Sequence, residues 1–265
     1  MSEPAPDGTR TAPDGSPYPD RSSPDFERDV RRMFGHIAER YDWFDHVASL
    51  GSDFLWRPRA LGQLDRFRTP GPIRRVLDVG CGTGDLARQV ARRYPGARVV
   101  GADFTGPMLR NALGRNRRAR EGDRVALARA TALRLPFTDG SFDLVTSAFV
   151  ARNLTDLPRA FGEFRRVLRP KGLVLTLEIT EPPSPTFGAL FHSYFDRVVP
   201  WMGAAVASAG PYRYLPESLR SLPPRGEFLE VIRAAGFPRV AAPSQSFGIV
   251  TSFLGEAGPS ADQRR

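Results

Sequence analysis

The chain has 265 residues, 41% of them hydrophobic, which is enough for one globular domain with a sizeable core. Its net charge is +9, and because Lys171 is the only lysine, 37 of the 38 basic residues are arginine. No RNA-binding motif accompanies them, so we expect no nucleic-acid partner and interpret the charge as a solvated basic surface, with contact to anionic lipid left open. Cys81 is the single cysteine, which excludes an intrachain disulfide, and with few histidines available we predict no metal.

The ends of the chain differ in composition from the middle. Residues 1–24 are polar and rich in proline, so we expect a disordered tail there and no secretory signal. The longest uncharged run, 198–212, is too short and too interrupted by proline and glycine to span a bilayer. We therefore expect a cytoplasmic protein that is soluble or peripheral at the inner face of the membrane.

Taken in chain order, the hydrophobic pattern predicts two helices and then an alternation of strands and helices. The first helices are expected over 26–40 and 52–63. The following strands are expected at 75–79, 98–102, 125–128, 142–149 and 173–179, and the helices between them at 85–94, 106–117 and 157–168. Such repetition predicts an α/β fold, a mostly parallel sheet with helices on both faces.

After residue 179 the pattern changes. Prolines end the strand, and an aromatic-rich segment, 187–214, lies within an insertion over about 182–224. A helix over 227–235 and strands at 239–242 and 247–253 then predict a reversed terminal hairpin. We expect one domain over 25–255 and a frayed tail over 256–265.

Residues 76–86 carry the most informative motif, Val-Leu-Asp-Val-Gly-Cys-Gly-Thr-Gly-Asp-Leu, a strand that leads through a glycine-rich turn into a helix. The glycines let the backbone approach a ligand, and the helix directs its free N–H groups at the same crevice. A nicotinamide dinucleotide fingerprint would place its third glycine at position 85, where Asp85 stands. Its pyrophosphate would meet a carboxylate, so an oxidoreductase is disfavoured.

Acidic residues around this loop favour a cationic cofactor. Asp103 ends the next strand, where a carboxylate can accept hydrogen bonds from both ribose hydroxyls. Asp78 and Asp85 add negative charge near the glycines, although Asp85 alone is equally explained as a favourable charge at a helix N-terminus. The sulfonium and ammonium groups of S-adenosylmethionine fit this set better than a diphosphate does.

From about residue 30 to 250 the chain resembles the class I S-adenosylmethionine-dependent methyltransferases, and within them the ubiquinone/menaquinone biosynthesis C-methyltransferases. The motifs most specific to the quinone branch are Tyr41-Asp42, the Arg152-Asn153 pair and Tyr212-Arg-Tyr-Leu. All matching segments lie at 34–42, 49–56, 77–85, 107–109, 135–137, 142–143, 152–156 and 212–218. The resemblance implies a Rossmann-like fold with a seven-stranded sheet, N-terminal helices and a helical insertion after the fifth strand.

The resemblance also implies roles for individual residues. Cofactor-binding positions would be Asp78, Gly80, Gly82, Thr83, Gly84, Asp103, Phe104, Met108, Thr131, Ala132 and Ala148. Catalytic positions would be Arg152, Asn153 and Tyr41, and substrate-binding positions Tyr194, Tyr212 and Tyr214. Arg152 would stabilise a phenolate, because a guanidinium is a poor base. A simple ion pair between Arg152 and Asp156 is the structural alternative.

Several positions depart from the family pattern, including Ala151, Asp45-His46 and 253–255, and three others bear on the choice of acceptor. Thr131 stands where the family has Asp or Asn, Ala148 where serine is frequent, and Val150 where glycine is usual. The leading hypothesis is C-methylation of a polyprenyl hydroquinone, demethylmenaquinol or a ubiquinone precursor. A methyltransferase of a small phenolic or polyketide-like compound and a non-catalytic cofactor-binding scaffold stay open as alternatives, as do the acceptor's identity and a homodimer.

Overall fold

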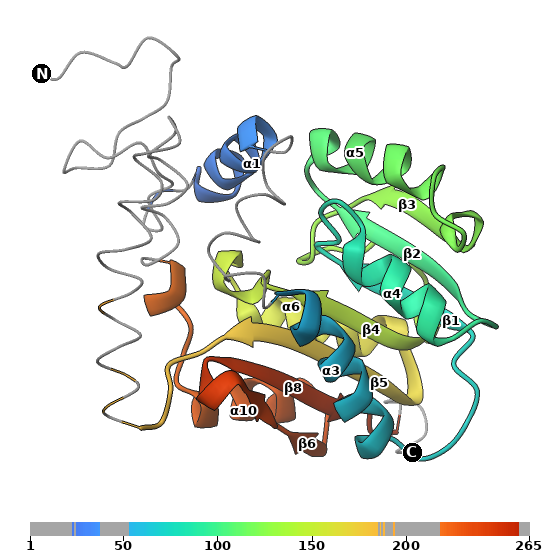
Figure 1. Ribbon diagram of the computed structural model, residues 1–265. Coiled ribbons are helices and arrows are strands. Elements are labelled where there is room, and N and C mark those ends of the chain that lie inside the picture. Colours follow the sequence, from blue (N-terminus) through green and yellow to red (C-terminus); the bar gives the residue numbers. More distant parts are fainter. Residues whose placement is uncertain are drawn as a thin grey trace, which may run out of the picture.

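The computed structural model describes residues 23, 25–37, 53–184, 186, 188, 193 and 218–259 (Figure 1). The expected tail over 1–24, apart from Ser23, and most of the aromatic segment over 187–214 lie outside the described residues.

A single mixed sheet forms the centre of the molecule, with strand order β3-β2-β1-β4-β5-β8-β6 (Figure 1). The parallel part contains β1 (Arg75–Val79), β2 (Arg98–Asp103), β3 (Val125–Arg129), β4 (Phe142–Ala148) and β5 (Leu168–Ile179). The antiparallel part contains β6 (Arg239–Ala241), β7 (Ser244–Gln245) and β8 (Val250–Glu256). The predicted parallel sheet with a reversed terminal hairpin is confirmed. The sheet has eight strands, not seven, because the short β7 also pairs with β8.

Helices cover both faces of this sheet, as the alternating pattern predicts. They are α1 (Phe26–Ile37), α3 (Asp53–Phe67), α4 (Asp85–Arg93), α5 (Gly106–Asn116), α6 (Leu157–Val167) and α10 (Arg225–Ala234). Single-turn 3-10 helices are η1 (Gly122–Arg124), η2 (Ala151–Asn153) and η4 (Ser246–Gly248).

The sheet separates two hydrophobic cores. On one face α3 and α4 pack against alternate strand residues such as Val76 and Leu144. On the other face α6 and α10 pack against the next residues along the same strands, Leu77 and Val145. Because both faces of the central strands are buried, the carboxyl ends of the strands are left as the place where a ligand can reach the sheet.

The strand boundaries near the C-terminus differ from those predicted. β5 begins at Leu168, five residues before the expected start, and Lys171 adopts a positive φ of 62° within it. β8 begins at Val250 because Phe247, with φ 57°, belongs to the turn of η4. The packed chain also continues past the expected end at Gly255, since Ala257 is buried and donates its N–H to the Gly172 carbonyl at 2.8 Å. The frayed tail therefore does not begin at residue 256.

No helix in the described part of the chain combines the length and apolar character that crossing a bilayer requires.

Asp143 connects the starts of neighbouring strands. It is 5% exposed, its Oδ2 accepts hydrogen bonds from the N–H groups of Arg74 and Arg75 at 2.6 and 2.9 Å, and its Oδ1 lies 2.9 Å from the Arg169 guanidinium. We predict that Asp143→Ala lowers the free energy of unfolding by about 2–4 kcal/mol, because backbone donors lose a charged acceptor. Urea denaturation measures this.

The matched control is Asp139→Ala. The Asp139 side chain is 78% exposed and pairs with Arg166 at 2.7 Å, so its removal should change the free energy of unfolding by less than about 1 kcal/mol. Equal effects of the two substitutions would contradict the role given to Asp143.

Candidate active site

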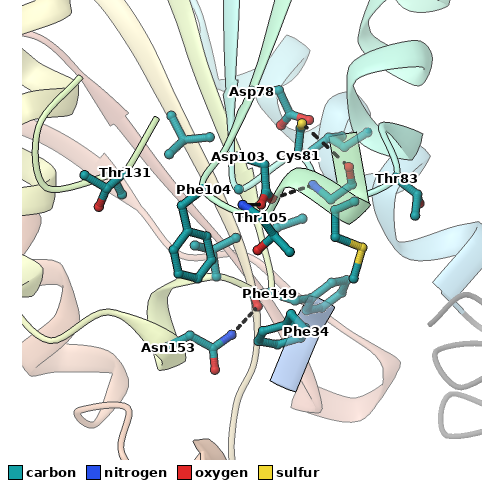
Figure 2. A pocket seen from close by; sticks show the side chains of 18 of the residues that line it. Phe34, Asp78, Cys81, Thr83, Asp103, Phe104, Thr105, Thr131, Phe149 and Asn153 are labelled. Carbon is teal, nitrogen blue, oxygen red and sulfur yellow. Dashed lines mark hydrogen bonds between the residues drawn. The ribbon is translucent and has the colours of Figure 1, made fainter. Parts of the chain in front are cut away.

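A cavity opens at the carboxyl ends of the central parallel strands (Figure 2). Figure 2 shows Asp78 and Cys81 toward one end of the view, Phe34 and Asn153 toward the other, and Asp103 between them. The wall is built from the glycine loop, the β2–α5 turn, the segment after β3 and the segment after β4. Within these, the lining residues include 79–83, 103–105, 108, 130–132, 148–150 and 153–154. Four chain segments far apart in the sequence thus meet where open α/β sheets bind ligands.

The glycine loop follows β1 directly. Gly80 has φ 66°, and an added Cβ would lie 2.3 Å from a Val150 methyl, so only glycine fits there. Its N–H and that of Cys81 both donate to the Ala102 carbonyl, at 2.7 and 3.1 Å, which binds the loop to β2. Gly84, at φ 85°, is the residue before α4 and allows the chain to turn into the helix. Gly84 lies behind the loop and does not line the cavity.

Asp103 bonds two turns together. Its Oδ2 accepts the Gly82 N–H at 2.9 Å and its Oδ1 accepts the Thr105 N–H at 2.8 Å. Burial raises the pKa of this carboxyl, and the amide hydrogen bonds oppose that rise. Asp103 lines the cavity, and a carboxylate oxygen can accept more than one hydrogen bond, as binding of a ribose diol would require.

Asp78 is the more deeply buried carboxylate, at 1% exposure. Its Oδ1 accepts the Thr146 hydroxyl at 2.7 Å, whereas its Oδ2 has no hydrogen-bond partner among the described residues. Burial raises the pKa of Asp78 to about 7, against the Thr146 hydrogen bond and the positive charge of Arg57. A cationic group bound in the cavity could donate the hydrogen bond that Asp78 Oδ2 lacks.

Asp85 contributes less to the cavity's charge than the sequence indicates. It lines the cavity but forms ion pairs with Arg88 and, at 3.6 Å, with Arg115. Lying in the first turn of α4, it also interacts favourably with the helix N-terminus. Asp78 and Asp103 are therefore the main source of negative potential.

The far wall of the cavity is less polar. Phe104, Met108, Ala132 and Ala148 line it, and the Thr131 hydroxyl accepts the Leu133 N–H at 3.4 Å. Helix α1 also belongs to this wall, which was not predicted from the sequence. Three α1 residues line the cavity, Glu27, Val30 and Phe34, and Val30 and Phe34 pack in one cluster with Phe104.

Arg152 lies behind the cavity wall. It is 6% exposed, does not line the cavity, and lies 3.4 Å from Glu178 of β5. The alternative pairing with Asp156 is wrong, because the Asp156 carboxylate instead caps α6 by accepting the Arg159 N–H at 2.9 Å. Glu178 also accepts the Ala151 N–H at 2.7 Å, and burial raises its pKa to about 7 despite the charge of Arg152.

Asn153, the neighbour of Arg152, does line the cavity, and its side-chain amide donates to the Phe149 carbonyl at 3.4 Å (Figure 2). The other expected catalytic and substrate-binding residues lie outside the described residues: Tyr41, Tyr194, Tyr212 and Tyr214.

Besides Glu27, two charged residues were missed in the sequence. Arg57 of α3 lines the cavity at 9% exposure, and Glu178 holds Arg152. The available signal for Arg57 was its place directly after Trp56, the last residue of a segment that matches the family. For Glu178 it was a lone carboxylate at the end of a buried strand, where a charge requires a partner.

Cys81 lines the cavity, and burial raises its thiol pKa well above the usual range. Its sulfur packs against the backbone of Gly101. No cluster of potential metal ligands occurs among the residues that the structure describes.

Comparison with known proteins was made by sequence and by structure. A model of the "ubiE/COQ5 methyltransferase family" matches residues 23–256. The demethylmenaquinone methyltransferase of Thermus thermophilus is 43% identical over 225 residues, covering 84% of this chain and 99% of the relative. The ubiquinone/menaquinone biosynthesis C-methyltransferase UbiE of Geobacter sulfurreducens is 39% identical over 232 residues, covering 86% and 88%.

Solved structures share the fold at low sequence identity. A possible histamine N-methyltransferase of Thermotoga maritima superposes with a TM-score of 0.59 at 18% identity, covering 86% of this chain and 99% of that one. The [4+2]-cyclase SpnF superposes with a TM-score of 0.63 at 16% identity, covering 88% and 97%. The fold therefore serves more than one chemistry, and the sequence match decides between them. The chain belongs to the ubiE/COQ5 methyltransferase family and is an S-adenosylmethionine-dependent methyltransferase.

Proposed function

We propose that this enzyme methylates a ring carbon of a polyprenyl hydroquinone, with demethylmenaquinol as the first candidate and a ubiquinone precursor as the second. One observation carries the proposal. Helix η2 contains Arg152 and Asn153, and its Asn153 lines the same cavity as Asp103 and the glycine loop. The names of the relatives from Thermus thermophilus and Geobacter sulfurreducens support the choice of acceptor.

The residues of the cavity fit the cofactor. Asp103 would hold the ribose hydroxyls, Gly80, Gly82 and Thr83 would border the methionine part, and Phe104 and Met108 would pack on the adenine. When bound, S-adenosylmethionine supplies the methyl group from its sulfonium. The chain's own contribution is then to hold donor and acceptor in line and to exclude water, which can account for a large part of the rate.

On the acceptor side, the ring carbon becomes nucleophilic when a phenolic proton leaves. Arg152 keeps its own proton and so cannot act as the base, and a water that it positions would take the phenolic proton. Its positive charge behind the wall would stabilise the phenolate that remains. Asn153, which reaches the cavity, would orient a ring oxygen. Glu178 fixes Arg152 from β5 and would keep its guanidinium in place.

The isoprenoid tail of such an acceptor requires an apolar path. We assign Tyr41, Tyr194, Tyr212 and Tyr214 to the acceptor side, together with contact between the enzyme and the inner face of the membrane. A small soluble phenol is the second candidate acceptor, because Thr131, Ala148 and Val150, three positions that depart from the family pattern, are all on the cavity wall.

The first prediction concerns the acceptor. Purified enzyme incubated with S-adenosylmethionine and demethylmenaquinol should give a product heavier by one methyl group, with the label of a methyl-labelled donor on a ring carbon. Mass spectrometry and carbon-13 spectroscopy check this. Methylation of a soluble phenol with no reaction on any prenylated quinol would replace the proposal by its second candidate.

The second prediction separates catalysis by Arg152 from its ion pair. Arg152→Ala alone would leave Glu178 buried without a partner, so the informative variant is the double substitution Arg152→Met with Glu178→Gln. We expect it to fold and to bind S-adenosylhomocysteine within about threefold of wild type, while kcat falls by about 10²-fold or more. Calorimetry and steady-state kinetics provide the two readouts, and wild-type turnover in the double variant would remove Arg152 from the mechanism.

The third prediction uses the titration of Asp78, whose pKa burial raises to about 7. Below that pH the carboxyl is mostly protonated and attracts an ammonium group weakly, so the affinity for S-adenosylhomocysteine should rise from pH 5.5 to pH 8, by at most about tenfold per unit. In Asp78→Asn the rise should disappear. Titration calorimetry across this range tests it, and an unchanged slope in the variant would assign the titration to another group, such as Asp103.

A further inference from the structure

Arg57 is the cation that α3 brings to the cavity. It is the only arginine or lysine among the described residues that line the cavity, whose other charged members are acidic. The preceding residue, Trp56, is hydrogen-bonded through both its side chain and its backbone. Its indole donates to the Ser246 hydroxyl at 2.9 Å, and its carbonyl accepts the Gln245 side-chain amide at 3.1 Å. These hydrogen bonds to Gln245 of β7 and Ser246 of η4 thus hold the part of α3 that carries Arg57.

One contact fixes the place of its guanidinium in the cavity wall: its Cζ lies 5.5 Å from the centre of the Phe149 ring, a cation–π contact. Its positive charge also lowers the pKa of the Asp78 carboxyl against the rise caused by burial. Phe149 is itself fixed, with φ 62° and its N–H donated to the Leu177 carbonyl at 2.8 Å. Arg57 is 9% exposed and lines the cavity, so little of it contacts bulk water.

The pair formed by Arg57 and Asp78 has the chemistry of a receptor for an amino-acid zwitterion. Asp78 is buried and has one carboxylate oxygen without a hydrogen-bond partner among the described residues, which suits an ammonium donor. A guanidinium presents forked N–H donors that match a carboxylate. Arg57, Asp78 and Gly80 all line the same cavity, so both charges are at the surface that a ligand would meet.

We propose that Arg57 binds the carboxylate of the methionine part of S-adenosylmethionine while Asp78 receives its ammonium group. Arg57 is then a cofactor-positioning residue, and the amino-acid end of the donor is held by opposite charges at the same end of the cavity. This inference depends on the donor alone, so it stands whichever acceptor is methylated.

The test is a cycle of two proteins and two ligands. Titration calorimetry compares wild type and Arg57→Gln, each with S-adenosylhomocysteine and with its decarboxylated analogue, which keeps the ammonium group. Wild type should bind S-adenosylhomocysteine about 10- to 100-fold more tightly than the analogue, the range expected for a charged hydrogen-bonded contact. In Arg57→Gln the preference should shrink to less than about threefold, and Arg57→Lys should retain an intermediate preference.

Arg59→Gln is the matched control, because Arg59 lies on the same helix and is exposed. It should show the full wild-type preference. The proposal is overturned if Arg57→Gln keeps that preference, whether its affinity for both ligands is unchanged or is reduced equally by a general disturbance of the site.

Discussion

The site depends on one carboxylate that is bonded at both oxygens to the backbone of different turns. Asp103 accepts N–H groups from Gly82 and Thr105, so the glycine loop after β1 and the turn after β2 cannot separate without breaking a charge-assisted hydrogen bond. The carboxylate is buried, and these amides offset part of its desolvation. The other residues that line the cavity lie around these two turns.

A second constraint is that buried carboxylates beyond Asp103 must also be compensated. Asp78 and Glu178 lie at the ends of β1 and β5, each with a pKa of about 7, and each has an arginine beside it, Arg57 and Arg152 respectively. Both guanidiniums lie near the Phe149 ring, at 5.5 and 5.6 Å from its centre. Only Arg57 of these two lines the cavity, whereas Arg152 and Glu178 lie behind its wall.

Much of this could be predicted from the sequence, because periodicity and glycine spacing are local signals. Local sequence patterns were enough to predict the alternating strands and helices from Arg75 to Ile179. They were also enough to place Asp78 and Asp103 beside the glycine loop. The partner of Arg152 could not be found that way. Asp156 is close in the sequence, but the carboxylate that lies beside Arg152 is on β5, and parallel strand pairing decides which strand ends meet. The same reason explains why Arg57 was missed: α3 precedes the sheet and its contact with β7 and η4 spans 190 residues.

The two halves of the cavity are held differently, and this determines where the enzyme can vary. The donor half consists of strand ends and short turns locked by backbone hydrogen bonds, so a change there disturbs the sheet. The half that we assign to the acceptor contains η2, and α1 lines the cavity where it packs against α5 and, in a small cluster, against Phe104. Three departures from the family pattern lie on the wall and alter its shape or polarity: Thr131, Ala148 and Val150. Val150 fills the space in front of Gly80, so a methyl-sized change there alters the room between donor and acceptor while the carboxylates that hold the donor stay in place.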